Sequence, residues 1–176
     1  MYKLKKTISI IGGDLRIVYL AQIFANENYE VFTYGLEKIE ILKKIKNIYL
    51  CENIEDCIKN SKLIISSIPL LQDEEYIKAP FSNRKISFNE FINKLNNKFL
   101  IAGKLPEKIK NIDNIETIDL LESEELAILN AISTAEGAIQ IAMEKTNFCI
   151  SDSNILILGF GRIGKVLAKK LQRNWC

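Results

Sequence analysis

The stretch 154-NILILGFGRIG-164 joins an apolar run to a Gly-x-Gly-x-x-Gly pattern. In a Rossmann fold this pattern links a strand to a helix. The first glycine permits the tight turn, the second lets a pyrophosphate approach the backbone, and the third lets the helix pack close to the strand. Free N–H groups and the positive end of the helix dipole then face the phosphates. The stretch therefore predicts nucleotide binding, with a glycine-rich turn that holds no ligand as the alternative. The residues expected to hold the cofactor are Gly159, Phe160, Gly161, Arg162, Ile163 and Gly164.

The sequence beyond this pattern is short. The acidic residue that binds the ribose is expected about 20 residues after the glycines, and only residues 165–176 follow Gly164. We therefore expect residues 148–176 to be only the beginning of an NAD(P)-binding domain. We also expect them to pack on the first domain, to bind a partner chain, or to be mobile, because one strand and one helix bury too little apolar surface to fold alone.

Upstream of this stretch, apolar runs alternate with helical patterns. We expect strands at 7–11, 29–34, 48–51, 63–68, 98–102 and 114–118, and helices after Asp14, over 36–46 and after a capping box at 87–90. Such alternation predicts a parallel sheet covered on both faces. A long helix is expected over 123–145, with Asp119 and Glu122 as its capping pair.

The predicted fold class is thus α/β. It comprises a three-layer Rossmann-like (flavodoxin-like) domain at 1–118, a connecting helix at 119–147, and the first strand and helix of a second Rossmann domain at 148–176.

Composition excludes several functions. Lys and Arg number 24 and Asp and Glu number 22, a net charge of +2 that is too small to indicate nucleic acid or an acidic membrane as a partner. No run of 18 apolar residues predicts a membrane span. Gly12 and Gly13 interrupt the first apolar run, which argues against a secretory signal.

Histidine is absent, which excludes Ser-His-Asp and Cys-His catalysis and a histidine general base within this chain. The cysteines form no Cys-x-x-Cys pair, so we expect free thiols in a reducing cytoplasm and no metal site. The four are Cys51, Cys57, Cys149 and Cys176.

A second glycine turn occurs in 12-GGDLR-16, again between a strand and a helix. Its glycines are adjacent and no third follows, and Asp14 places a carboxylate where a phosphate would lie. The first domain is therefore expected to be Rossmann-like in shape without binding a nucleotide. Asp14 is either a plain helix N-cap or part of a site. Arg16 can pair with Asp14 or reach a carboxylate of a ligand.

Other polar residues lie at predicted strand ends, where open α/β sheets bind ligands. Ser66, Ser67 and Lys104 lie at strand ends and could bind a ligand, or they could be ordinary strand-end residues. Arg84 lies in a polar loop and could bind a ligand or simply be solvated. Within the long helix, Ser133 to Gly137 is unusually polar, and we expect it to face the cleft between the domains. Gly137 costs the helix on the order of 1 kcal/mol relative to alanine, which indicates a close approach by another group or a packing compromise.

Four segments occur together in the order 10-IIGGDLR-16, 65-ISSIP-69, 134-TAEGAI-139 and 158-LGFGRIG-164. Together they resemble the family of the dipicolinate synthase A subunit of spore-forming bacteria. The resemblance implies NAD(P), with NADP favoured over NAD, in the complete protein. It also implies a flavoprotein-like B subunit as partner and the oxidation of a dihydrodipicolinate-type precursor to pyridine-2,6-dicarboxylate. The expected compartment is the cytoplasm of the mother cell during sporulation, and the 176-residue chain alone is expected to be inactive.

A dicarboxylate substrate requires cationic donors, for which Arg16, Arg84 and Lys104 are the candidates. The catalytic residue is unknown. The alternatives are another two-domain dehydrogenase of the hydroxyacid or alanine class, and a non-catalytic binding or assembly module that associates through the apolar stripe of the long helix. The full set of expected substrate-binding residues is Asp14, Arg16, Ser66, Ser67, Arg84, Lys104, Thr134 and Glu136.

Overall fold

The structure is a computed structural model that describes residues 6–151 and 153–173. It divides into two compact units, Met1–Leu120 and Leu121–Cys176. The N-terminal unit holds all six strands, and the second unit is helical in its described part.

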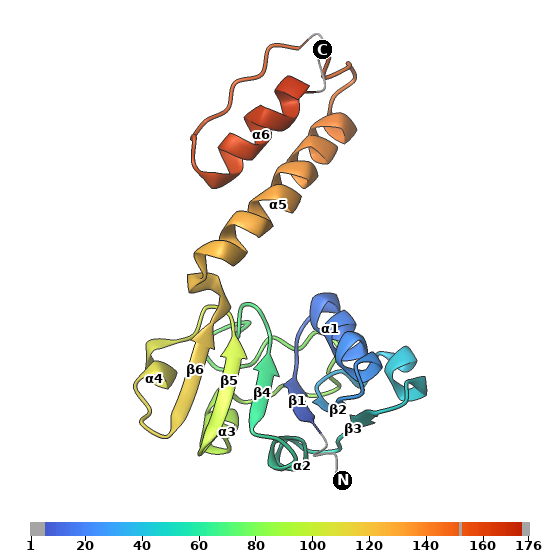
Figure 1. Ribbon diagram of the computed structural model, residues 1–176, viewed down its shortest axis with the longest axis vertical. Coiled ribbons are helices and arrows are strands. Elements are labelled where there is room, and N and C mark those ends of the chain that lie inside the picture. The colour runs from blue at the N-terminus through green and yellow to red at the C-terminus, as the bar shows by residue number, and fades with distance from the viewer. Residues whose placement is uncertain (1–5, 152, 174–176) are drawn as a thin grey trace. The chain divides into compact units, whose positions relative to one another are not determined.

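The N-terminal unit is built on a six-stranded sheet in the order β3-β2-β1-β4-β5-β6, with every neighbouring pair parallel (Figure 1). This is the doubly wound Rossmann order; a flavodoxin-like sheet has the order 2-1-3-4-5. The α/β fold class is confirmed, and the strand order assigns it to the Rossmann type. The strands are β1 (Thr7–Ile11), β2 (Glu30–Tyr34), β3 (Ile48–Leu50), β4 (Leu63–Ser66), β5 (Lys98–Ala102) and β6 (Ile115–Asp119).

Helices cover both faces of the sheet and make the three layers. On one face, α1 (Leu15–Asn26) and the 3-10 helix η1 (Glu40–Lys44) bury Ile17, Ala21 and Leu42 against β1 and β2. On the other face, α2 (Ile54–Lys59), α3 (Phe88–Asn93) and α4 (Glu107–Lys110) pack around Phe91. Successive residues of a strand point to opposite faces, so Ile64 and Ile65 of β4 belong to the two different cores.

Helix starts follow local capping chemistry. The Asp14 carboxylate accepts a hydrogen bond from the Arg16 backbone N–H at the start of α1. Of the expected capping box at α3, the N-cap half is confirmed, because Ser87 Oγ accepts from the Glu90 backbone N–H at 3.4 Å. At α2 the cap is Asn53.

The helix expected over 36–46 is wrong, because only the short turn η1 forms there. Ile39 is extended, and the Lys38 backbone N–H donates to Phe81 O at 3.0 Å, which holds this segment against a later loop. Two of the apolar residues whose spacing suggested a helix, Leu36 and Leu42, are buried and instead anchor this loop in the core. The β-branched Ile39, Ile41 and Ile45 also disfavour helix relative to leucine or alanine.

The second unit contains α5 (Glu124–Lys145) and α6 (Arg162–Arg173), which pack against each other; the short η2 (Leu120–Glu122) precedes α5 (Figure 1). The long helix is confirmed, but its cap is Ser123, whose Oγ accepts from Leu126 N at 3.3 Å. The Asp119 carboxylate accepts from the backbone N–H groups of Lys104 and Leu105. The expected Asp119–Glu122 capping pair stays a prediction.

Residues 154–158, expected to be a strand, form no strand in the described structure. Leu156 and Leu158 are 82% and 87% exposed. A strand forms only beside a hydrogen-bonded neighbour, and none lies next to this segment among the described residues.

By length and composition alone, α5 is apolar enough to cross a membrane. One such helix is weak evidence, and only 11% of its apolar stretch is buried. The expectation that the chain has no membrane partner remains a prediction.

Thr33 of β2 is a buried polar residue without a hydrogen bond. Its side chain is 1% exposed, and Oγ1 has no partner in the described part of the chain. Replacing Thr33 with valine is expected to raise the free energy of unfolding by about 1–2 kcal/mol, since it removes an unsatisfied hydroxyl. Urea unfolding measures this change. The control is Ser9→Ala, because Ser9 Oγ hydrogen-bonds to Cys57 O at 2.5 Å and to Ser61 Oγ at 2.6 Å. That change should destabilise the protein, and equal effects of the two substitutions would contradict the assignment.

Candidate functional site

The candidate site lies at the carboxyl ends of β1 and β4. These two strands adjoin at the centre of the sheet, where the chain direction of the connections reverses. Open α/β sheets bind ligands at this switch point. After β1 the chain turns through Gly12 and Gly13 into α1, and after β4 it enters the loop that carries Lys78.

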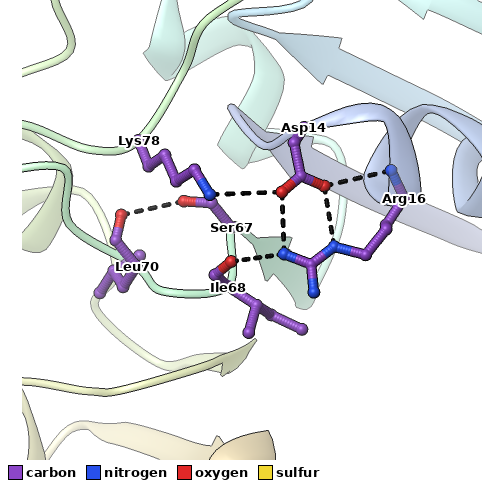
Figure 2. Close-up of polar contacts among 6 residues, drawn as sticks. All are labelled: Asp14, Arg16, Ser67, Ile68, Leu70 and Lys78. Carbon is purple, nitrogen blue, oxygen red and sulfur yellow. Dashed lines mark hydrogen bonds and ion pairs between the residues drawn. The ribbon is translucent and has the colours of Figure 1, made fainter. Parts of the chain in front are cut away.

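Asp14, Arg16 and Lys78 form a charged cluster at this point (Figure 2). Arg16 Nε donates to Asp14 Oδ1 at 3.0 Å, and Arg16 Nη2 donates to Asp14 Oδ2 at 2.8 Å, a two-point contact. Lys78 Nζ approaches Asp14 Oδ2 at 3.3 Å. Arg16 Nη2 also donates to Ile68 O at 2.7 Å, which ties α1 to the loop after β4. Asp14 is confirmed as the N-cap of α1 and also pairs with both cations. Its role in a functional site stays a prediction.

The cluster has an excess of positive charge. Two cations face one carboxylate, so one positive charge is left over at the switch point. The hydrogen bond from the Arg16 side chain holds the pKa of Asp14 at about 2, against an ordinary value of 3.8. Arg16 is 64% exposed, and its Nη1 points away from Asp14 (Figure 2). The guanidinium can therefore contact an anion from solvent while it keeps its internal partners.

At the same edge, the backbone N–H groups of Gly13 and Arg16 already have partners. The Gly13 backbone N–H donates to Lys78 O at 2.8 Å, and the Arg16 backbone N–H is taken by Asp14. A Cβ on Gly12, whose φ is +63°, would lie 2.9 Å from Lys78 O. The backbone of the loop that carries Lys78 thus lies against this glycine turn. The expectation that the first domain binds no nucleotide stays a prediction.

The other substrate-binding residues expected in the first domain make no hydrogen bond or ion pair with the charged cluster in the described part of the chain. Ser66 Oγ donates to Ile11 O at 2.7 Å and Ser67 Oγ donates to Leu70 O at 2.9 Å, and both side chains are fully buried. Both hydroxyls are thus engaged with backbone carbonyls and fix the ends of the strands. Arg84 lines a different hollow. Lys104 is exposed in a turn with φ of +53°, where Asp119 accepts from its backbone N–H.

Lys78 is the member of the cluster that sequence reasoning missed. It lies in a loop without a motif, and it reaches Asp14 only because the Lys78 backbone N–H donates to Leu70 O and its carbonyl accepts from Gly13. Nothing in the local sequence signals that approach.

In the second unit, Gly159 and Gly164 occupy positions where the backbone calls for glycine, although no strand precedes the turn among the described residues. Gly159 has a φ of +94°, a turn conformation suited to glycine. A Cβ on Gly164 would lie 2.2 Å from Gly159 O, whereas Gly161 has open space around it. The Gly161 carbonyl accepts from the Lys165 backbone N–H at 3.0 Å. The open space where a Gly161 Cβ would lie leaves room for a pyrophosphate. Beside them, Phe160 and Ile163 are exposed, and Arg162 pairs with Glu124 at 2.5 Å.

The polar segment of α5 lies partly beside this glycine loop. Thr134 lines a hollow together with Gly159, Gly161 and Gly164, although its hydroxyl donates to Asn130 O at 2.8 Å within the helix. Glu136 pairs with Lys170 of α6 at 2.6 Å. A Cβ on Gly137 would meet no atom within 4 Å, so the close approach that this glycine suggested does not occur among the described residues.

No group of three or more Cys, Asp or Glu side chains able to hold a metal ion occurs within residues 6–151 and 153–173. Cys51, Cys57 and Cys149 are free thiols, and Cys176 lies outside the described residues.

The lowered pKa of Asp14 predicts a dependence of stability on pH. A carboxyl whose pKa is lower in the folded state stabilises the protein above its ordinary pKa of 3.8, and that contribution is lost as pH falls toward about 2. Asp14→Asn keeps an N-cap residue but has no titratable group. In urea unfolding, the stability advantage of the natural chain over this variant should be constant above about pH 5 and shrink between roughly pH 4 and 2. A difference that is independent of pH would contradict the role of the ion pair.

The fold and the cluster together define a Rossmann-like domain that carries two cations and one carboxylate at the switch point of its sheet. Comparison with known proteins identifies the family. The chain belongs to the family described as the N-terminal domain of the dipicolinate synthase A subunit, whose family model matches residues 7–123.

Relatives of known sequence or structure match most of the chain. The dipicolinate synthase A subunit of Bacillus subtilis (strain 168) is 23% identical over 175 residues, covering 92% of this chain and 56% of that protein. The crystal structure of the A chain from Bacillus subtilis matches with a TM-score of 0.79 and 23% identity, covering 98% of this chain and 59% of that one. The A subunit from Bacillus halodurans matches with a TM-score of 0.79 and 25% identity, covering 96% and 58%. The chain thus spans somewhat more than half the length of these relatives.

Proposed function

We propose that this chain is the substrate-binding part of the A subunit of a dipicolinate synthase, an NAD(P)-dependent oxidoreductase. The reaction is the oxidation of a dihydrodipicolinate-type precursor to pyridine-2,6-dicarboxylate. The substrate loses a hydride and a proton, and the ring becomes aromatic. Because aromatisation supplies much of the driving force, the reaction does not demand a strong general base, which is consistent with a chain that lacks histidine.

The observation that carries this proposal is the surplus positive charge of the Asp14–Arg16–Lys78 cluster at the switch point of the sheet. Charge-assisted hydrogen bonds from Arg and Lys are the strongest that a carboxylate finds in proteins. We assign Arg16 and Lys78 to one carboxylate of the substrate, and Asp14 to holding both cations in place. Arg84, Lys104, Thr134 and Glu136 remain candidates for the rest of the substrate.

The glycine loop at 159–164 is our candidate for the cofactor site. Gly161 leaves the backbone open, and Gly164 keeps α6 close to the turn. When bound, NAD(P) would accept the hydride. The 154–158 segment has no strand partner among the described residues, so we expect weak nucleotide binding and no turnover by this chain alone.

The rest of the proposal follows the family. The B subunit is the expected partner, and the expected setting is the cytoplasm of the mother cell during sporulation. Two other functions compete with this one. Another two-domain dehydrogenase would bind a different acid at the same cluster. A non-catalytic assembly module would use the exposed apolar residues of α5, such as Ile128, Leu129 and Ile141, for self-association.

Thermal unfolding and calorimetric titration with pyridine-2,6-dicarboxylate test the proposal. The buffer should be free of divalent metals, because this ligand chelates them. At about 100 times the dissociation constant, binding stabilises by about 2.7 kcal/mol, which corresponds to a rise in Tm of roughly 5–10 °C for a chain of this size. Pyridine-2-carboxylate is the control, and its shift should be smaller.

Three outcomes separate the alternatives. A shift with dicarboxylate but not with NAD or NADP supports the proposal. No shift with either pyridine acid contradicts the substrate site. A concentration-dependent dimer in ultracentrifugation, without any ligand response, would favour the assembly module.

A further inference from the structure

The loop after β4 contacts the turns that follow both of its neighbouring strands. On the β1 side, Arg16 Nη2 donates to Ile68 O at 2.7 Å (Figure 2). On the β5 side, the Gly103 backbone N–H donates to Ser67 O at 3.3 Å, and a Cβ on Gly103 would lie 2.6 Å from Ile68 Cγ2. Lys104 is the residue after Gly103. Ile68 therefore lies between the turn that carries Arg16 and the turn that carries Lys104.

The sheet gives the separation of these two turns. β4 pairs in parallel with β1 on one side and with β5 on the other. The hydrogen bond from Gly103 to Ser67 continues the β4–β5 pairing beyond the strand ends. Neighbouring strands lie about 4.8 Å apart, so the two turns are separated by two such spacings, roughly 10 Å. The long, flexible side chains of Arg16 and Lys104 can therefore both contact one small ligand at this edge.

Lys104 has a backbone conformation that lysine rarely adopts. Its φ is +53°, in the left-handed region where residues other than glycine are uncommon. Asp119 stabilises this turn, because Oδ1 accepts from the Lys104 backbone N–H at 2.9 Å and Oδ2 accepts from the Leu105 backbone N–H at 2.7 Å. Glycine or asparagine would adopt the conformation at a lower cost. Residues held in such conformations are concentrated at ligand sites, where the cost is retained for function.

The Lys104 side chain is available to a ligand. The residue is exposed, and its ammonium has no hydrogen bond or ion pair in the described part of the chain. Arg84 is the other expected cation outside the cluster, and it lines a hollow with Tyr34 at the end of β2. In the sheet, β5 adjoins β4 but β2 does not. Lys104 is therefore the cation that flanks the loop after β4 on the side away from Arg16.

We propose that Lys104 binds the second carboxylate of the substrate and that Asp119 positions it. This inference rests on the proposed function, in which Arg16 and Lys78 bind the first carboxylate. The loop that carries Ile68 lies between the two cationic turns and sets the distance between them. Lys104 determines specificity, because only a ligand with two carboxylates contacts the cations on both sides of the loop.

Calorimetric titration of the 176-residue chain with pyridine-2,6-dicarboxylate and pyridine-2-carboxylate in metal-free buffer tests this specificity. In Lys104→Asn the affinity for the dicarboxylate should fall about tenfold, since a charge-assisted contact is lost. The affinity for the monocarboxylate should not change, because this acid contacts only Arg16 and Lys78. The Tm of the variant should equal or exceed that of the natural chain, since asparagine tolerates the left-handed conformation better than lysine.

Lys46→Asn is the matched control. Lys46 is exposed and lies just before β3 begins, at the opposite edge of the parallel sheet. The substitution removes the same charge, and it should leave the affinities for both acids unchanged.

Two variants test the positioning role of Asp119. Asp119→Ala removes both acceptors of the turn and should lower the preference for the dicarboxylate over the monocarboxylate. Asp119→Asn keeps one acceptor oxygen and should restore part of that preference. Because the two variants have the same charge, the difference between them reports the turn and not the charge. A purely structural role would instead weaken binding of both acids equally.

The outcomes separate this inference from the proposed function. If Lys104→Asn keeps the dicarboxylate preference of the natural chain, or weakens both acids equally, the proposal is overturned while the site at Arg16 stands. Loss of the preference in Arg84→Gln but not in Lys104→Asn would assign the second carboxylate to the other hollow and would also overturn it. A natural chain that binds neither acid would overturn the substrate site and this inference together.

Discussion

Replacing Gly13 with alanine is expected to lower the free energy of unfolding by about 3 kcal/mol or more. Gly13 has a φ of +106°, and a Cβ there would lie 2.5 Å from Ile17 Cγ1 and 2.6 Å from Ile17 Cβ. Backbone strain of this kind costs about 1–3 kcal/mol, and forcing extra atoms into a packed site costs a further 1–3 kcal/mol or so. Urea unfolding followed by circular dichroism measures the loss. The variant should also lose dicarboxylate binding, because Gly13 sets the direction in which Asp14 and Arg16 leave β1.

Gly137→Ala is the matched control. It makes the same chemical change in the middle of α5, where a Cβ would meet nothing within 4 Å. We expect stability to rise by up to about 1 kcal/mol, since alanine has the higher helix propensity. If the two substitutions change stability by the same amount, the account of the Gly13 turn is wrong.

Replacing Arg16 with alanine is expected to weaken binding of pyridine-2,6-dicarboxylate by about 10–100-fold. A hydrogen bond to a charged group contributes about 1.5–3 kcal/mol, and every 1.4 kcal/mol or so is a factor of ten in affinity. The variant also frees Asp14, whose carboxylate would then face only Lys78 and repel the ligand. Calorimetric titration at low ionic strength, where charge interactions are least screened, measures the effect.

Two further variants separate charge from geometry. Arg16→Lys keeps the positive charge but cannot make the two-point contact with Asp14, so its affinity should fall between those of the natural chain and Arg16→Ala. Lys78→Met removes the second cation and keeps most of the aliphatic stem, and it should weaken binding without changing the fold. Unchanged affinity in Arg16→Ala, with the protein still folded, would remove the substrate assignment from this cluster.

Much of the N-terminal fold could be predicted from sequence, because the parallel strands are short apolar runs closed by glycine, proline or polar residues. The capping residues Asp14 and Ser87 marked two helix starts through local chemistry alone. The helices α2 and α4 were missed because, at six and four residues, they are too short to show a helical period. The helix expected over 36–46 did not form for a tertiary reason. The Lys38 backbone N–H donates to Phe81 O, a residue too distant in sequence for a local pattern to indicate the contact.

The candidate site was only partly predictable for the same reason. Asp14 and Arg16 were visible in the glycine turn because their positions follow from the strand-to-helix geometry. Ser66 and Ser67 were visible too, but whether a hydroxyl faces a ligand or a neighbouring carbonyl depends on packing between strands. Lys78 could not be found, since its partner lies 64 residues away.

The place of β1 in the middle of the sheet has a consequence for folding during synthesis. One edge of β1 pairs with β2, but the other waits for β4, with partner residues such as Ile11 and Ser66 55 positions apart. At about 5–20 residues per second, the ribosome needs roughly 3–11 s to cover that distance. During this interval the apolar edge of Thr7–Ile11 is an open template for pairing with other nascent chains. The sheet that places Arg16 beside Lys78 can thus be completed only after β4 has been synthesised.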